Sequence, residues 1–218
     1  MTESKGMPVE GLLVRTGIQP DHWGSRLSNF TDRYPSGFYK ELTALAEKIV
    51  KGTLEQKYVF LTGKAGSGKT HFLVGCFRAR VLADEGVMGA DHALYLPFSG
   101  LINEIISGFP ETHSSRVGLA QYLTVKYLFL DDISRGEKVI NPDKMESQIL
   151  HDILLDRYEV NRHLICSSNF DPRTLRRLIK TIWGEYALSR VDASSVFVEF
   201  PDKDLRQKNS KHIGEVSK

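Results

Sequence analysis

The chain has little of what marks a membrane-spanning or disulfide-rich protein. Its 218 residues include only two cysteines, Cys76 and Cys166, and both lie in apolar stretches. Two cysteines cannot build a disulfide framework or a zinc site, so we expect buried thiols of a reducing compartment. No apolar run approaches the length of a membrane span, and residues 1–5 do not begin a signal peptide. The expected protein is cytoplasmic and has no membrane partner.

Strong net charge and common catalytic signatures are also missing. With 29 Lys and Arg against 27 Asp and Glu, the formal net charge is +2, so any nucleic-acid site must be local. The seven histidines show no metal-ligand spacing, and no Ser-His-Asp or Cys-His signature is recognisable. The apolar content of 41% and charged content of 26% are typical of one ordinary globular domain.

What the chain does contain is a phosphate-binding loop. Residues 63–70 read GKAGSGKT, which satisfies the pattern G-x-x-x-x-G-K-[ST] at every fixed position. The glycines let backbone N–H groups face an anion, Lys69 places a charge between the β- and γ-phosphates, and the Thr70 hydroxyl can bind Mg²⁺. An apolar run at 58–62 precedes the loop and helical spacing follows it, as a phosphate site requires. The chain is therefore predicted to bind a nucleoside triphosphate through Gly63, Lys64, Ala65, Gly66, Ser67, Gly68, Lys69, Thr70 and His71.

The rest of the pattern alternates between strands and helices. Apolar residues at 38, 42, 45 and 49 predict a helix that ends at Gly52. Strands are predicted at 93–97, 127–130, 163–167 and 195–200, and helices after 101, over 117–123, and after the N-cap residues Asn141 and Asp171. This alternation predicts a parallel sheet flanked by helices. We expect a flexible arm at 1–17, one domain at 18–206 and a polar tail at 207–218.

Polar residues close two of the predicted strands. The carboxyl ends of parallel strands face the ligand crevice, so Asp131 would hold Mg²⁺, largely through water, and Asp132 would orient the attacking water. A loop that merely begins with two acids is the alternative, and the phosphate loop upstream argues against it. Asn169 closes the next strand, where its amide could bind the γ-phosphate and the lytic water together. In other contexts an Asn at this place is a turn residue or a cap.

A basic stripe follows in the next predicted helix. Its cations fall at i, i+3, i+4 and i+7, on one helix face: Arg173, Arg176, Arg177 and Lys180. Such a stripe can follow the phosphates of single-stranded DNA. A solvated outer face explains the same pattern, so both interpretations stay open.

Taken together, these features resemble the AAA+ ATPases of the DnaC/DnaI helicase-loader and IstB transposition-helper group, over about residues 18–206. Residues 63–70 match the Walker A loop, LFLDDI at 128–133 the Walker B strand, and Ser168-Asn169 the sensor-one stretch. Residues 18–30 match the segment near the adenine, and 196–206 match the closing strand with its final arginine. The resemblance implies a P-loop NTPase fold of AAA+ type, ATP and Mg²⁺ as cofactors, and a role in DNA replication or transposition. It also implies a head-to-tail homo-oligomer in which Ser189-Arg190 supplies an arginine finger in trans, with single-stranded DNA and a replicative helicase or transposase as partners.

Three departures from the family pattern shape these expectations. Asp132 stands where many AAA+ proteins carry Glu, which suits slow or DNA-stimulated hydrolysis. Little chain precedes residue 18 to form the domain with which loaders grip their helicase, and this favours an IstB-like or other DNA-remodelling role. After residue 206 there is no room for the usual AAA+ lid, which this group also lacks. Two other functions stay open: a nucleotide-gated adaptor with little hydrolysis, and a P-loop small-molecule kinase, which the acids and Asn169 favour less.

Overall fold

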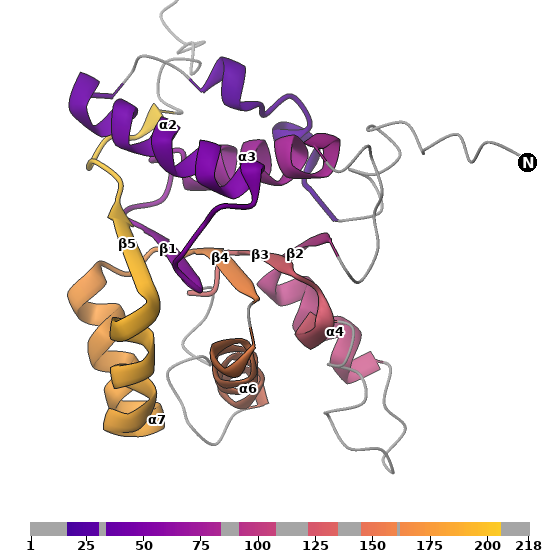
Figure 1. Cartoon of the computed structure of the whole chain (residues 1–218), viewed down its shortest axis with the longest axis vertical. Helices are drawn as coiled ribbons and strands as arrows, with labels where there is room; N and C mark the ends of the chain where they lie inside the picture. The colour runs from indigo at the N-terminus through magenta and orange to yellow at the C-terminus, as the bar shows by residue number, and fades with distance from the viewer. Residues whose placement is uncertain are drawn as a thin grey trace, which may run out of the picture.

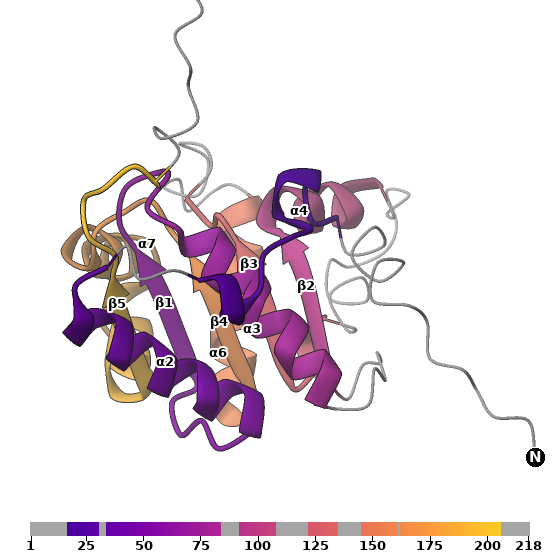
Figure 2. The same ribbon diagram turned by 90° about the horizontal axis from the view of Figure 1, so that it is seen from above.

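The computed structural model describes residues 17–30, 34–83, 92–107, 122–134, 145–160 and 162–205. These residues form a five-stranded, fully parallel sheet between two layers of helices (Figure 1). The strands are β1 (Tyr58–Thr62), β2 (Ala93–Pro97), β3 (Tyr127–Asp131), β4 (His163–Ser167) and β5 (Ser195–Glu199). Their order across the sheet is β2-β3-β4-β1-β5, so β1 lies between β4 and the edge strand β5 (Figure 2).

Helices cover both faces of this sheet. On one side lie α2 (Ser36–Lys51) and α3 (Lys69–Ala83), and on the other lie α4 (Phe98–Ser107), α6 (Met145–Glu159) and α7 (Pro172–Ser194) (Figure 1). Two short 3-10 helices, η1 (Pro20–His22) and η2 (Leu27–Asn29), precede α2. In the part of the chain that the structure describes, no helix is both long and apolar enough to cross a membrane.

The alternating side chains of each strand supply two separate cores. Val59 and Leu61 of β1 pack with α2 and α3, whereas Tyr58 and Phe60 pack with the helices on the opposite face. Both faces of the central strands are thus buried, which explains why their sequences are continuous apolar runs rather than alternating ones. Cys76 and Cys166 are both fully enclosed, as predicted, and burial raises the pKa of each thiol.

Most predicted elements are confirmed within two residues. Helix α2 begins at Ser36 and ends at the left-handed Gly52, and the last strand ends at Glu199 rather than at 200. Asp171 caps α7 as expected, since its carboxylate accepts the N–H groups of Arg173 and Thr174 at 2.9 Å. Hydrogen bonds from Thr174 lower the pKa of Asp171. The predicted helix start at Asn141, most of the predicted helix 117–123, residues 1–16 of the arm, and the tail lie outside the described residues.

Helix α7 turns back on itself at Gly184. The φ of 85° and ψ of 174° at this residue are not helical and are open essentially only to glycine. Arg176 and Asp192 show the consequence, because their side chains meet at 2.7 Å across 16 residues. In a straight helix that separation would span about 24 Å. Residues 172–183 and 185–194 are therefore two segments that lie side by side.

A buried arginine holds the amino-terminal edge of the sheet. The side chain of Arg157 is fully enclosed, and its guanidinium donates to the carbonyls of Tyr122 at 2.9 Å, Val125 at 2.7 Å and His163 at 2.8 Å. Burial lowers the pKa of Arg157 to about 9, so the group still carries its charge at neutral pH. One side chain thereby joins the end of α6 to the segments that lead into β3 and β4.

Candidate nucleotide-binding site

A cleft of about 1110 Å³ opens at the carboxyl-terminal edge of the sheet. The phosphate loop between β1 and α3 forms its floor, and the ends of β2, β3 and β4, the start of α4 and the segment 17–30 form its walls. Nine residues predicted from the sequence line it: Ala65, Gly66, Gly68, Lys69, Thr70, His71, Asp131, Asp132 and Asn169. The other predicted loop residues, Gly63, Lys64 and Ser67, complete the turn behind this lining, where the ammonium group of Lys64 pairs with Asp202.

Tight packing dictates the glycines of the loop. Gly66 and Gly68 have φ values of 81° and 98°, in the left-handed region. A Cβ at Gly68 would lie 2.2 Å from the Tyr34 hydroxyl, and one at Gly66 would lie 2.3 Å from the carboxylate of Asp204. Lys69 is only 6% exposed, and its ammonium group donates to the carbonyls of Gly63 and Lys64 at 2.7 Å each. The loop therefore holds a buried cation at its centre, as triphosphate binding requires.

Tyr34 holds the phosphate loop from outside, and no sequence motif predicted this contact. Its hydroxyl donates to the Ser67 carbonyl at 2.5 Å, and its ring stacks on Phe30 with centroids 5.2 Å apart. Both rings also contact Phe200, which follows β5. The segment 17–30 and the end of β5 thus meet beside the phosphate loop, where the resemblance expects the adenine.

The carboxylate of Asp131 is held from three elements. Its Oδ1 accepts from the Thr70 hydroxyl at 3.0 Å and the Ser167 hydroxyl at 2.5 Å, and its Oδ2 accepts from the Tyr95 hydroxyl at 3.2 Å. Burial, with the nearby charge of Asp131, raises the pKa of Tyr95 and keeps that hydroxyl a proton donor. Mg²⁺ usually binds one or two protein carboxylates together with phosphate oxygens and water. A hydroxyl and a carboxylate oxygen beside a phosphate loop fit that ion.

Asp132 and Asn169, both predicted from the sequence as site residues, meet next to Asp131. Asp132 has a φ of 55°, the one positive value at a non-glycine residue in the described ranges, and its N–H donates to the Ser167 hydroxyl at 2.8 Å. Its Oδ1 accepts from the Ser134 hydroxyl at 2.8 Å and from the Asn169 amide at 3.2 Å. Ser134 also accepts the Asn169 N–H at 2.8 Å.

Ser134 and Ser167 are site residues that the sequence motifs did not predict. The pairing of β3 with β4 could have indicated Ser167. Leu130 pairs with Cys166, so the next residues of the two strands, Asp131 and Ser167, lie side by side. For Ser134 there was no such signal, because its place depends on the turn after β3.

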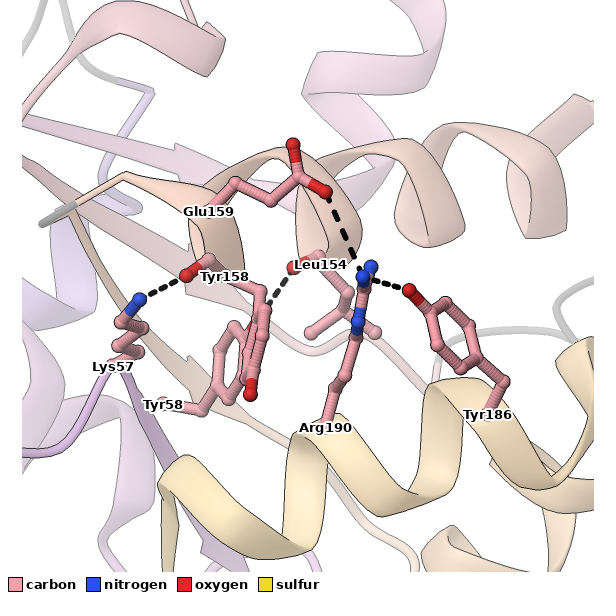
Figure 3. A network of polar contacts seen from close by, with 7 residues as sticks. All are labelled: Lys57, Tyr58, Leu154, Tyr158, Glu159, Tyr186 and Arg190. Atoms are coloured by element: carbon pink, nitrogen blue, oxygen red, sulfur yellow. Dashed lines mark hydrogen bonds and ion pairs between the residues drawn. The ribbon is translucent and has the colours of Figure 1, made fainter.

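Arg190 lies away from the cleft. Its guanidinium carbon is 4.9 Å from the centre of the Tyr158 ring and 3.9 Å from that of Tyr186. One guanidinium nitrogen donates to the Tyr186 hydroxyl and lies 3.6 Å from Glu159 (Figure 3). The neighbouring Tyr58 hydroxyl donates to the Leu154 carbonyl, which places this cluster at the start of β1. The phosphate loop begins at the other end of the strand, about 13 Å away for five residues. Arg190 therefore cannot serve the cleft of its own subunit.

The basic stripe lies on the first segment of α7, and ion pairs within the chain neutralise half of it. All four side chains belong to exposed residues, but Arg176 pairs with Asp192 at 2.7 Å and Lys180 pairs with Glu185. The guanidinium of Arg176 also lies over the Phe197 ring at 4.5 Å. Within the described ranges, Arg173 and Arg177 form no ion pair, so the field that could attract DNA is weaker than the spacing alone predicted.

No protein-family model and no curated protein sequence matches the chain. The structure of the chain does, however, resemble several solved protein structures. The DnaC helicase loader is 18% identical, with a TM-score of 0.65 over 84% of this chain and 100% of that chain. DnaI is 19% identical, with a TM-score of 0.64 over 87% and 95% of the two chains. AMPPCP-bound DnaA from Aquifex aeolicus is 18% identical, with a TM-score of 0.61 over 87% of this chain and 53% of that one. The chain thus has the α/β fold of the AAA+ P-loop domains of DnaC, DnaI and DnaA.

Proposed function

We propose that the protein is a Mg²⁺-dependent ATPase of DNA replication, similar in role to a helicase loader, which assembles head to tail with copies of itself. The observation that carries this proposal is the group formed by Thr70, Asp131, Asp132 and Asn169 beside the phosphate loop, with Arg190 at the opposite edge of the sheet. DnaA structures bound to AMPPCP, and to AMPPCP with single-stranded DNA, support nucleotide and DNA as ligands. Transposition, a helicase or transposase partner and a cytoplasmic address stay predictions from the sequence.

The side chains divide the work of hydrolysis among themselves. Lys69 and the loop N–H groups would hold the β- and γ-phosphates, and Thr70 and Asp131 would hold Mg²⁺, which neutralises charge on the transferred group. Oδ1 of Asp132 is occupied by Ser134 and Asn169, whereas its Oδ2 has no hydrogen-bond partner among the described residues. This second oxygen is the one that would accept a proton from the attacking water.

A nucleotide-gated adaptor with little hydrolysis is the second candidate. Asp132, which stands where many AAA+ proteins carry Glu, keeps this candidate open, and Ser134 and Asn169 already engage one of its two carboxylate oxygens. A small-molecule kinase has less support, since none of the stripe cations Arg173, Arg176, Arg177 and Lys180 lines the cleft. Single-turnover phosphate release with and without single-stranded DNA separates the ATPase from the adaptor.

Mixing two inactive variants tests the shared site. Asp132→Asn and Arg190→Ala should each bind ATP and lose hydrolysis, because a finger supplies roughly 10³–10⁵ in rate and the water needs its acceptor. The mixture should regain activity, since some interfaces then pair an intact Asp132 with an intact Arg190. Arg173→Ala, an exposed arginine on the same helix, is the matched control and should keep wild-type activity on ATP alone. No recovery at concentrations where the wild type assembles would refute head-to-tail catalysis.

A further inference from the structure

We propose that Tyr158 and Tyr186 form an aromatic clamp, which positions the Arg190 guanidinium for the cleft of a neighbouring copy. This inference rests on the proposed function, because it assigns a role to residues around the finger. Figure 3 shows the Arg190 side chain between the two rings, with Glu159 above it. The ring centres lie 4.9 Å and 3.9 Å from the guanidinium carbon, within the range of cation–π attraction.

The exposure of these side chains distinguishes the clamp from core packing. Tyr186 is 64% exposed, the highest value among the large apolar side chains of the described ranges, whereas the Arg190 side chain is only 18% exposed. An exposed tyrosine that covers an arginine contributes little to folding. Tyrosine and arginine are, however, the residues that most often anchor protein interfaces.

Two features of the chain build the clamp. The break at Gly184 makes residues 185–194 a separate helical segment, and its i, i+4 spacing places Tyr186 and Arg190 on one face. The other half of the clamp is anchored by Lys57, whose ammonium group donates to the Tyr158 carbonyl and lies 4.8 Å from its ring centre. The clamp is thereby fixed to the start of β1.

A second copy of this chain is the partner whose charge complements the Arg190 guanidinium. Its cleft is lined by the carboxylates of Asp131, Asp132 and Glu104 and would hold the phosphates of the nucleotide. The ion pair of Arg190 with Glu159 is long, at 3.6 Å, and the Glu159 side chain is 70% exposed, so the pair is weak and phosphate can replace it. A clamped guanidinium loses less rotamer freedom when it reaches the phosphate, and this raises kcat rather than ATP affinity.

Tyr186→Ala tests the clamp in the full-length protein. Because the ring is exposed, the variant should keep the wild-type Tm and ATP affinity, while kcat under assembling conditions falls about fivefold, the factor expected for one exposed cation–π contact. Tyr186→Phe keeps the ring and loses only the hydroxyl that accepts from the Arg190 guanidinium, so it should recover most of kcat. Tyr39→Ala removes another exposed tyrosine, on α2, and should change nothing. Added Asp132→Asn subunits carry an intact clamp and should raise the rate of Tyr186→Ala, which a purely structural defect would not allow.

Arg190→Ala, measured in parallel, separates a failure of the clamp from a failure of the shared site. If Arg190→Ala hydrolyses ATP at the wild-type rate, the shared site itself is wrong and the clamp falls with it. If Arg190→Ala is inactive but Tyr186→Ala keeps its kcat, even combined with Tyr158→Leu, the clamp alone is overturned. An equal loss in Tyr186→Phe and Tyr186→Ala would assign the effect to the hydroxyl and also overturn ring stacking.

Discussion

Replacing Ser167 by alanine should remove two contacts at once, one to the carboxylate of Asp131 and one to the backbone N–H of Asp132. The Ser167 hydroxyl donates to Asp131 at 2.5 Å and accepts the N–H of Asp132 at 2.8 Å, and the residue is 1% exposed. Without it, the carboxylate that faces Mg²⁺ loses one of three donors, and the N–H of a residue with positive φ loses its acceptor.

The two losses differ in size and in what they change. A hydrogen bond to a charged group is worth about 1.5–3 kcal/mol, so the Mg²⁺ concentration needed to bind nucleotide should rise roughly 10- to 150-fold. The unpaired N–H of Asp132 should lower the free energy of unfolding by about 1–3 kcal/mol. Ser168→Ala offers a matched control, because Ser168 is equally buried and, among the residues that the structure describes, its hydroxyl accepts only the N–H of Phe170 at 3.1 Å.

Both effects can be measured without turnover. A fluorescent β,γ-methylene analogue of ATP is titrated with Mg²⁺ on each variant, and urea unfolding gives the stability. The Mg²⁺ midpoint should shift for Ser167→Ala and stay at the wild-type value for Ser168→Ala. Equal midpoints for the two variants would refute the idea that β4 orients Asp131 for the metal.

Three further predictions concern the rest of the fold. Arg157→Met should lower the free energy of unfolding by about 3–5 kcal/mol in urea titrations, because it leaves several buried carbonyls without donors; a loss below about 1 kcal/mol would contradict this. Burial lowers the pKa of His163, with nearby cations adding to the effect, so the unfolded chain takes up that proton first. The wild type should therefore lose stability as pH falls below about 6.5, and His163→Gln should show a flatter dependence in urea unfolding. Neutralising Arg173 and Arg177 should weaken single-stranded DNA binding and flatten its salt dependence, and an unchanged salt slope would leave these residues as solvated surface.

The sequence predicted the sheet and the centre of the site well, for a physical reason. Strands buried on both faces need continuous apolar runs, and such runs can be recognised without knowing their neighbours. Asp131, Asp132 and Asn169 were found because each lies within three residues of the end of such a run. The phosphate-loop motif and the polar residues at the strand ends together therefore located the cleft.

Residues whose role depends on strand register or on a distant chain segment escaped prediction. Tyr34 reaches the loop across 33 residues and Tyr95 reaches Asp131 across 36, and nothing local marks either of them. The stripe on α7 shows the converse, since helical spacing correctly placed its cations on one face. Asp192 neutralises Arg176 only because the chain turns back at Gly184, and that reversal was not visible in the spacing.

The positions of cleft and clamp also limit how copies of this chain can pair. The cleft lies at the carboxyl-terminal edge of the sheet and Arg190 lies at its amino-terminal edge. A two-fold dimer would therefore bring the two clefts together or the two clamps together. Such a dimer would complete no site, whereas a head-to-tail contact completes one site at every interface. An open chain of this kind always leaves one terminal cleft without a finger. Activity per subunit should therefore rise with protein concentration as chains lengthen, and a rate per subunit that is constant across the assembly range, measured by phosphate release beside light scattering, would contradict the shared site.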